Sequence, residues 1–247
     1  MTEVLRVEGA TREFSSTAGV FDLDLEVGRG EIHALVGLNG SGKTTLMRLL
    51  LGILRPASGA IRIAGVPLPQ VRAGWARVGH LVEQPVAYPE LDSQTNLSIA
   101  ARLKGLAGTH LDEAVAASAR EFELEKYLKI PARRLSQGNR QRLGLAAALA
   151  HDPALVVLDE PTNALDPAGV ILLRNSLRRR ADAGAAILVS SHHLDEVARI
   201  ADRIWLLNHG RIIGALDPKG PDLERRFFDA VHADDLHADG LRDEVGS

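Results

Sequence analysis

Hydrophobic and polar residues alternate near the start of the chain, where two stretches are typical of half-buried strands. VLRVEGA at 4–10 and FDLDLEV at 21–27 place apolar side chains between polar or small ones. The run IHALVG at 32–37 is apolar almost throughout, as expected of a strand that is buried on both faces. A glycine-rich turn follows, and KTTLMRLLLG at 43–52 then has helical spacing. We therefore predict a strand, a tight turn and a helix in succession.

The pattern becomes helical between about residues 86 and 150. LDSQTNLSIAARLKGL, HLDEAVAASAREFEL and LSQGNRQRLGLAAALA each favour a helix, and Pro131 separates the second from the third. We predict that this part of the chain is a helical subdomain inserted between strands.

Strand and helix patterns alternate again after residue 154. ALVVLD, AAILVS and DRIWLLN are strand-like, and helical spacing lies between them. This alternation indicates an α/β fold with a mostly parallel sheet. Residues 1–215 are predicted to form one domain. For 216–247 we predict a C-terminal helix and an acidic, flexible tail that begins at Asp229.

Charge and composition exclude several classes of protein. The 247 residues include 29 basic and 32 acidic ones, so there is no basic excess of the kind that nucleic-acid-binding domains carry, and we expect no nucleic acid partner. The absence of cysteine excludes disulfides and thiolate metal sites. No stretch approaches the roughly 20 apolar residues of a membrane-spanning helix, and the first residues lack a signal-peptide pattern. We expect a soluble chain that leaves any membrane crossing to another protein.

The segment GLNGSGKT at 37–44 matches the phosphate-binding loop pattern between a strand and a helix. Its glycines let backbone N–H groups turn inward around phosphate oxygens, and the following helix adds its positive N-terminus. We expect Lys43 to bridge the β- and γ-phosphates of ATP and the Thr44 hydroxyl to bind Mg²⁺. The residues expected to contact the nucleotide here are Gly37, Asn39, Gly40, Ser41, Gly42, Lys43, Thr44 and Thr45.

Two adjacent acids end the apolar run LVVLDEP at 155–161. Open α/β sheets bind ligands at the carboxyl ends of their strands, so Asp159 can hold the magnesium ion and Glu160 can polarise an attacking water. Taken alone, such a run is often a strand that simply reaches solvent. Beside a phosphate-binding loop, the two acids predict hydrolysis.

A second anion-binding device lies in LSQGN at 135–139, where Ser136 begins a predicted helix. A helix N-terminus with a serine can bind an anion, and this one has no evident anion of its own. Two interpretations are open at this point. Ser136 is either an ordinary helix cap or part of another subunit's site.

The order of these motifs resembles the ATP-binding subunit of ABC transporters over about residues 3–215. The phosphate-binding loop, the helical insert, LSQGN, LVVLDEP, TNALD and SSHH follow one another as in that family. The resemblance implies a P-loop NTPase core with a mostly parallel sheet, an N-terminal antiparallel β subdomain and the inserted helical subdomain. It also implies that Ser136 and Gly138 contact the γ-phosphate of ATP held by a second ATP-binding subunit.

The resemblance assigns three further residues. Phe14, in TREFSS, lies where the family has an aromatic ring that stacks on adenine. Asp166, in TNALD, matches the loop that crosses the dimer interface. His192, in VSSHH, matches a histidine that senses the γ-phosphate and takes part in catalysis; His193 is its neighbour and competitor.

Two departures from the family pattern affect the site. The serine-led segment usually has two adjacent glycines and a glutamine, but here Ser136 is followed by Gln137, Gly138 and Asn139. The family also has a glutamine that coordinates magnesium and water where this chain has Glu83, with Gln84 one residue later. We expect Glu83 to take that catalytic and metal-binding role, and Gln84 is the alternative. This pattern resembles the branch that handles bacitracin, lantibiotics and similar peptides.

The resemblance implies an ATPase that dimerises on ATP, as a homodimer or heterodimer, on the inner, cytoplasmic face of the cell membrane. It would drive a membrane permease subunit, with export of an antibiotic or peptide as the favoured direction. A soluble ABC ATPase that acts on ribosomes or DNA is one alternative, although the chain has neither a second such domain nor a long coiled coil. An importer subunit is another. The LSQGN segment disfavours a P-loop switch or kinase.

Overall fold

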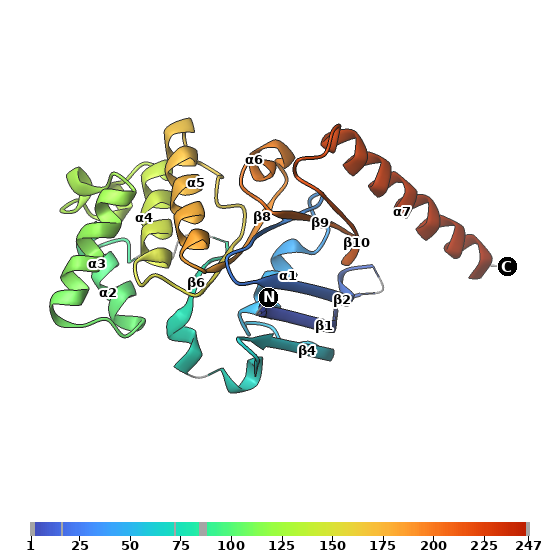
Figure 1. Ribbon diagram of the computed structural model, residues 1–247, viewed down its shortest axis with the longest axis horizontal. Helices are drawn as coiled ribbons and strands as arrows, with labels where there is room; N and C mark the ends of the chain where they lie inside the picture. The colour runs from blue at the N-terminus through green and yellow to red at the C-terminus, as the bar shows by residue number, and fades with distance from the viewer. Residues whose placement is uncertain (1–2, 16, 72, 84–87, 246–247) are drawn as a thin grey trace.

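Two β-sheets and the helices around them make up the computed structural model (Figure 1), which describes residues 3–245 apart from 16, 72 and 84–87. The strands are β1 (Glu3–Glu13), β2 (Gly19–Gly28), β3 (Ile32–Val36), β4 (Ser58–Ile63), β5 (Val66–Pro67), β6 (Val78–Leu81), β7 (Leu155–Leu158), β8 (Ala186–Ser191), β9 (Arg203–Asn208) and β10 (Arg211–Leu216). The α-helices are α1 (Lys43–Leu50), α2 (Ser93–Leu103), α3 (Gly108–Glu121), α4 (Gln137–Leu149), α5 (Pro167–Asp182), α6 (Leu194–Ala198) and α7 (Leu223–Val245). Short 3₁₀ helices cover Leu68–Gln70, Ala73–Arg77, Glu125–Tyr127 and Ala132–Arg134.

The larger sheet has the strand order β10-β9-β3-β8-β7-β6 and is parallel except for the β9–β10 pair. The smaller sheet, β2-β1-β4-β5, is antiparallel throughout. The predicted α/β class, with a mostly parallel sheet and an N-terminal antiparallel one, is therefore confirmed. Since β3, β8 and β7 are successive parallel strands of this sheet, their carboxyl ends lie at one edge. This edge carries the loop after β3, the two acids after β7 and the serines at the end of β8.

β3 separates two apolar cores because its side chains alternate between its faces. Ala34 and Val36 belong to the core shared with the helices from α2 to α5. Leu35 points to the other side, into a core that contains α1 and the antiparallel sheet. Every residue of β3 is buried, which accounts for the continuous apolar run in the sequence.

Helices α2, α3 and α4 pack against one another at the far side of the molecule from the antiparallel sheet (Figure 1). Asp92 caps α2 by accepting a hydrogen bond of 2.8 Å from the N–H of Thr95. The Asp92 side chain thereby stabilises an otherwise free helix end. Buried Leu97, Phe122 and Leu143 join this helical region to the main core.

The C-terminal part differs from the sequence-based prediction in two ways. Strand β10 was not predicted, and the acidic stretch from Asp229, expected to be flexible, is a continuous part of helix α7 up to Val245. Burial of Phe227 and Val231 explains part of the difference. In addition, the Asn208 amide donates to Asp234 and Asp235 at 2.9 and 2.8 Å, which holds α7 against the end of β9.

Among the described residues, no helix combines the length and the apolar character that crossing a bilayer requires.

Candidate functional site

The loop between β3 and α1 presents backbone N–H groups at the carboxyl edge of the larger sheet. Gly40 and Gly42 have φ angles of 83° and 106°, in the left-handed region that glycine enters without strain. Gly42 caps α1 without a side-chain hydrogen bond, so the first N–H groups of this helix stay open for an anion. A β-carbon on Gly37 would lie 2.3 Å from the carbonyl oxygen of Leu207, so that position also requires glycine. The loop is thus shaped for phosphate.

Lys43 places its ammonium group inside this loop. The side chain is 7% exposed, and Nζ donates to the carbonyls of Gly37 and Leu38 at 2.7 and 3.2 Å. Nζ also lies 3.6 Å from Oε1 of Glu160. Ser41 is buried too, and its Oγ has no hydrogen-bond partner among the described residues. A buried cation and an unpaired hydroxyl within one loop suit a bound phosphate chain.

Thr44 and Asp159 form the part of the site that could hold a metal ion. The Thr44 hydroxyl donates to Oδ2 of Asp159 at 2.6 Å, and the Ser190 hydroxyl donates to the other carboxylate oxygen. Among the residues whose side chains the structure describes (3–236 apart from 16, 72, 73 and 84–87), no group of three or more His, Cys, Asp or Glu could hold a metal. A hydroxyl and one carboxylate fit Mg²⁺, because this ion takes few protein ligands and completes its shell with water and phosphate oxygens.

Glu160 is held in a strained conformation with its carboxylate against His192. Its φ angle is 46°, and its N–H donates to Oγ of Ser190 at 2.8 Å. Oε2 lies 2.8 Å from Nδ1 of His192 and also accepts the His192 N–H at 3.3 Å. The His193 ring contacts that of His192, with ring centroids 3.9 Å apart and ring planes tilted by 43°. The backbone N–H of His193 donates to the Ser191 hydroxyl. The structure thus brings His192, rather than His193, to the carboxylate.

Ser136 and Asp166 lie at a second location, the N-terminal ends of α4 and α5. Ser136 caps α4 by accepting the Asn139 N–H at 3.2 Å. Asp166 caps α5 by accepting the Gly169 N–H, and it also accepts from Arg142 at 2.6 Å; Arg142 and then this N–H hold the pKa of Asp166 below its usual value. Ser136 and Asp166 both line an open hollow of about 620 Å³. In the described part of the chain, no hydrogen bond or ion pair joins Ser136 to the phosphate-binding loop.

Phe14 and Glu83 are less closely tied to the site. Phe14 is 55% exposed, and the guanidinium of Arg12 lies 5.6 Å from its ring centroid. Glu83 forms an ion pair with Arg48 of α1, and the structure gives it no hydrogen bond to Thr44 or Asp159 among the residues that it describes. Gln84, the alternative to Glu83, lies outside the described residues.

The remaining expected contacts lie in the loop or directly after it. Asn39 is exposed at the tip, and Thr45 lies in the first turn of α1. Sequence reasoning missed Ser190, which holds both Asp159 and the Glu160 backbone. Its signal was present in SSHH, because β8 neighbours β7 and ends at the same edge. The contacts that Gln141 and Arg142 make with the loop after β7 were also missed.

Comparisons with known proteins agree with this geometry. The family model described as ABC transporter matches residues 20–163. The bacitracin transport ATP-binding protein BcrA of Enterococcus faecalis is 34% identical over 216 residues, which cover 86% of this chain and 69% of that protein. The Nod factor export ATP-binding protein I of Cupriavidus pinatubonensis is 36% identical, covering 88% and 67%.

A solved structure described as an ATP binding subunit of an ABC transporter superposes with a TM-score of 0.81 at 30% identity, covering 96% of this chain and 98% of that one. The family match spans the phosphate-binding loop, Ser136 and the two acids that follow β7. The chain therefore belongs to the ABC transporter family, as an ATP-binding and ATP-hydrolysing subunit.

Proposed function

We propose that this subunit hydrolyses ATP in a site that it shares with a second ATP-binding subunit and thereby drives a membrane permease that exports a peptide or antibiotic. One observation carries the proposal. The loop with Lys43, the Thr44–Asp159 pair and the Glu160–His192 pair meet at one sheet edge. Ser136 lies at a separate helix end and has no anion partner among the described residues of its own chain.

Each residue at the sheet edge has a role in this proposal. Lys43 and the loop N–H groups bind the phosphates, and Thr44 and Asp159 hold Mg²⁺. The ion, when bound, neutralises charge on the β- and γ-phosphates. Glu160 accepts a proton from the attacking water, and His192 orients this carboxylate and contacts the γ-phosphate. Ser190 positions both acids by its two hydrogen bonds.

The second subunit supplies what the sheet edge lacks. Ser136 and Gly138 present the N-terminus of α4 to the γ-phosphate in the partner's loop, and the partner does the same in return. Asp166 crosses the interface beside them. A two-fold dimer satisfies this exchange, because each subunit offers one loop and one helix end. Phe14 stacks on adenine, for which its exposed ring is available.

Relatives support the direction and cargo that we propose. The names of two of them specify bacitracin transport and Nod factor export. In this proposal a separate permease subunit crosses the membrane, and the ATP-hydrolysing subunit binds it at the inner face.

Glu160→Gln tests the proposed function. The variant keeps the contacts to phosphate and metal but loses the base, so hydrolysis should fall by about 10²–10⁴-fold while ATP binding persists. ATP should also trap the dimer, which light scattering in saturating ATP and magnesium would detect. Glu113→Gln, which changes an exposed carboxylate on α3, is the control. A Glu160→Gln protein that stays monomeric and turns over at nearly the normal rate would contradict the proposal.

A further inference from the structure

The loop from Glu160 to Asp166 rests on the first turns of α4 in the same subunit. Buried Gln141 donates to the Pro161 carbonyl at 2.9 Å. The α-carbon of Gly138 approaches the loop so closely that an added β-carbon would lie 2.9 Å from the carbonyl oxygen of Ala164. At the end of the loop, Arg142 donates to Asp166 at 2.6 Å. The loop therefore contacts α4 at Pro161, Ala164 and Asp166, and a movement of α4 would displace it.

This loop begins at the proposed base. Glu160 and Ala164 have φ angles of 46° and 67°, which non-glycine residues hold only where the surroundings fix them. Gln141 bonds the carbonyl of Pro161, the residue that directly follows Glu160. A displacement of α4 would move this carbonyl and change how the Glu160 carboxylate meets His192.

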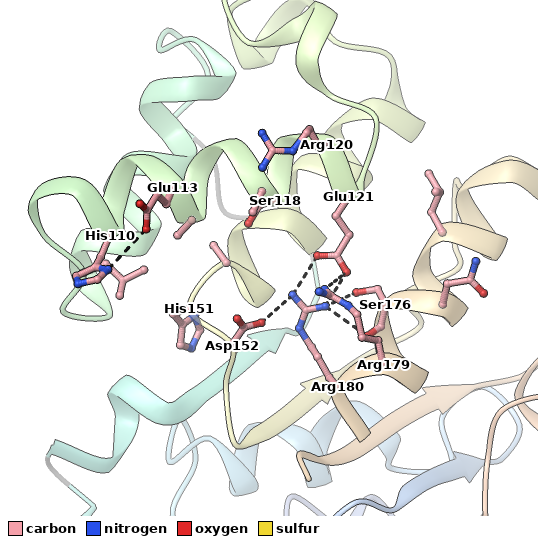
Figure 2. A pocket seen from close by; sticks show the side chains of 16 residues that line it. His110, Glu113, Ser118, Arg120, Glu121, His151, Asp152, Ser176, Arg179 and Arg180 are labelled. Atoms are coloured by element: carbon pink, nitrogen blue, oxygen red, sulfur yellow. Dashed lines mark hydrogen bonds and ion pairs between the residues drawn. The ribbon is translucent and has the colours of Figure 1, made fainter. Parts of the chain in front are cut away.

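The other end of α4 is fixed as well. Arg180 of α5, 6% exposed, donates to the carbonyl of Leu149, the last residue of α4, at 3.0 Å. Figure 2 shows the same guanidinium bonded to Glu121 of α3 and to Ser176. Because the C-terminal end of α4 is held in this way, a nucleotide that binds against Ser136 mainly displaces the N-terminal end of α4. This is the end that contacts the loop from Glu160 to Asp166.

We propose that Gln141 and Arg142 are positioning residues that couple the nucleotide against Ser136, held by the second subunit, to Glu160 of their own subunit. This inference rests on the proposed function, because it requires that Ser136 contacts a nucleotide in another subunit. It makes each site's hydrolysis depend on the occupancy of the opposite site. Coupling between two sites requires a packed element whose arrangement depends on both of them, and here α4 together with the loop after β7 is that element.

The test compares Gln141→Leu, Arg142→Gln and Arg142→Lys with wild type and with Arg178→Gln. Arg178 forms exposed ion pairs with Asp182 and Asp202 and has no hydrogen bond or ion pair with the loop among the described residues, so it is a matched arginine control. Three quantities are measured: ATP binding without magnesium, the ATPase rate as a function of ATP concentration, and thermal unfolding. Gln141→Leu removes no charge, so it carries the test if Arg142→Gln fails to fold.

We expect cooperative hydrolysis in wild type and in Arg178→Gln. Gln141→Leu and Arg142→Gln should bind ATP normally, turn over roughly ten-fold or more slowly, and lose cooperativity, with a Hill coefficient near 1. Arg142→Lys should restore part of the ATPase rate and part of the cooperativity, because lysine keeps the positive charge beside Asp166 but lacks the planar guanidinium group of arginine. A merely structural role would lower the unfolding temperature without changing the Hill coefficient.

Two results would overturn the coupling: a wild-type Hill coefficient of 1, or variants that keep both rate and cooperativity. Loss of ATP binding in the variants would also overturn it, because the residues would then act in their own pocket. Failure of the proposed function looks different. In that case the wild-type protein does not hydrolyse ATP, and the Glu160→Gln variant does not form a dimer when ATP is added.

Discussion

The Glu83 carboxylate has two possible partners, Arg48 and a metal ion. It is half exposed in its ion pair with Arg48, and pairs of this kind contribute only about 0.2–1 kcal/mol. Breaking the pair is therefore inexpensive, and the pair does not oppose the metal-binding role that we propose for Glu83.

Glu83→Gln should retain most activity because a coordinating oxygen survives, whereas Glu83→Ala should lose most of it, by about 10-fold or more. Wild type should also need magnesium more steeply than Glu83→Gln, since in the role that we propose the extra negative charge joins those of Asp159 and Glu160 at the metal. The measurement is ATPase activity titrated with magnesium, with Arg48→Ala as the control. If Gln84→Ala is the damaging change and Glu83→Ala is nearly silent, the role belongs to Gln84.

At the scale of one residue, the sequence predicted best where a motif dictates backbone geometry. Lys43, Thr44, Asp159 and Glu160 meet because the phosphate-binding loop and the two acids follow parallel strands of one sheet, whose carboxyl ends lie at the same edge. Which of two adjacent histidines turns inward depends on backbone hydrogen bonds around Ser191, which sequence spacing does not contain. The same limit applies to Glu83 and Gln84.

Between elements, Arg180 fastens the helical region to α5. Its guanidinium is almost fully buried and reaches Glu121, Ser176 and the Leu149 carbonyl, beside an open hollow of about 740 Å³ (Figure 2). Burial alone would raise the pKa of Glu121, but the hydrogen bond and charge of Arg180 outweigh it and lower that pKa. The cluster is thus a connected set of ion pairs in which Glu121 and the buried Arg180 form the central pair, with Arg179 and Asp152 at its edge.

Arg180→Ala should lower the free energy of unfolding by about 3 kcal/mol, because the largely buried Glu121 carboxylate then keeps only the exposed Arg179 as a charged partner and the Leu149 carbonyl loses one of its two donors. Arg179→Ala is the matched control, since Arg179 pairs with the same Glu121 but is 63% exposed, and it should cost less than about 1 kcal/mol. Denaturant unfolding of the two variants gives both values. Equal losses would contradict this description of the cluster.

Helices and strands were predicted correctly where the hydrophobic pattern is strongly periodic. They were missed where contacts between distant parts of the sequence determine the structure. The buried run of β3 and the helical spacing of α2, α3 and α4 are visible in the sequence. The order β10-β9-β3 is not, because β10 forms by pairing with β9 after a tight turn. The acidic composition after Asp229 predicted a flexible tail. In the structure, Phe227 in the first turns of α7 is buried, and Asp234 and Asp235 in the acidic stretch accept hydrogen bonds from the Asn208 amide.

In the whole molecule, His151 links stability to pH. It follows α4, beside the hollow in Figure 2, and neither ring nitrogen has a hydrogen-bond partner within the described residues. Burial, and after it the charge of Lys104, lowers the pKa of His151 to about 4. The unfolded chain, with a pKa near 6.5, therefore binds the proton first as the pH falls. Stability should accordingly decrease between pH 6.5 and 4.

His151 should account for roughly 2 kcal/mol of lost unfolding free energy between pH 7 and pH 5. His151→Met should remove that share of the slope, leaving the contributions of His80 and His33, whose pKa values burial also lowers. Denaturant unfolding at both pH values gives the slope, and His110→Gln, which changes a histidine that is 83% exposed, should leave it unchanged. A slope as steep in His151→Met as in wild type would show that folding does not lower the pKa of this histidine.

The shared site is tested most directly by mixing two inactive variants. Ser136→Arg should bind ATP as a monomer yet not hydrolyse it, and Lys43→Ala should fail to bind it. In a mixed dimer, one site lacks both groups, while the other combines an intact loop with an intact Ser136. The ATPase rate of the mixture is the measurement. We predict that activity returns on mixing, but to well below the wild-type rate. At most half of the dimers carry one working site, and the coupling proposed above slows that site when the opposite one holds no ATP. A mixture as inactive as its components, or a Ser136→Arg monomer that no longer binds ATP, would contradict a site built from two subunits.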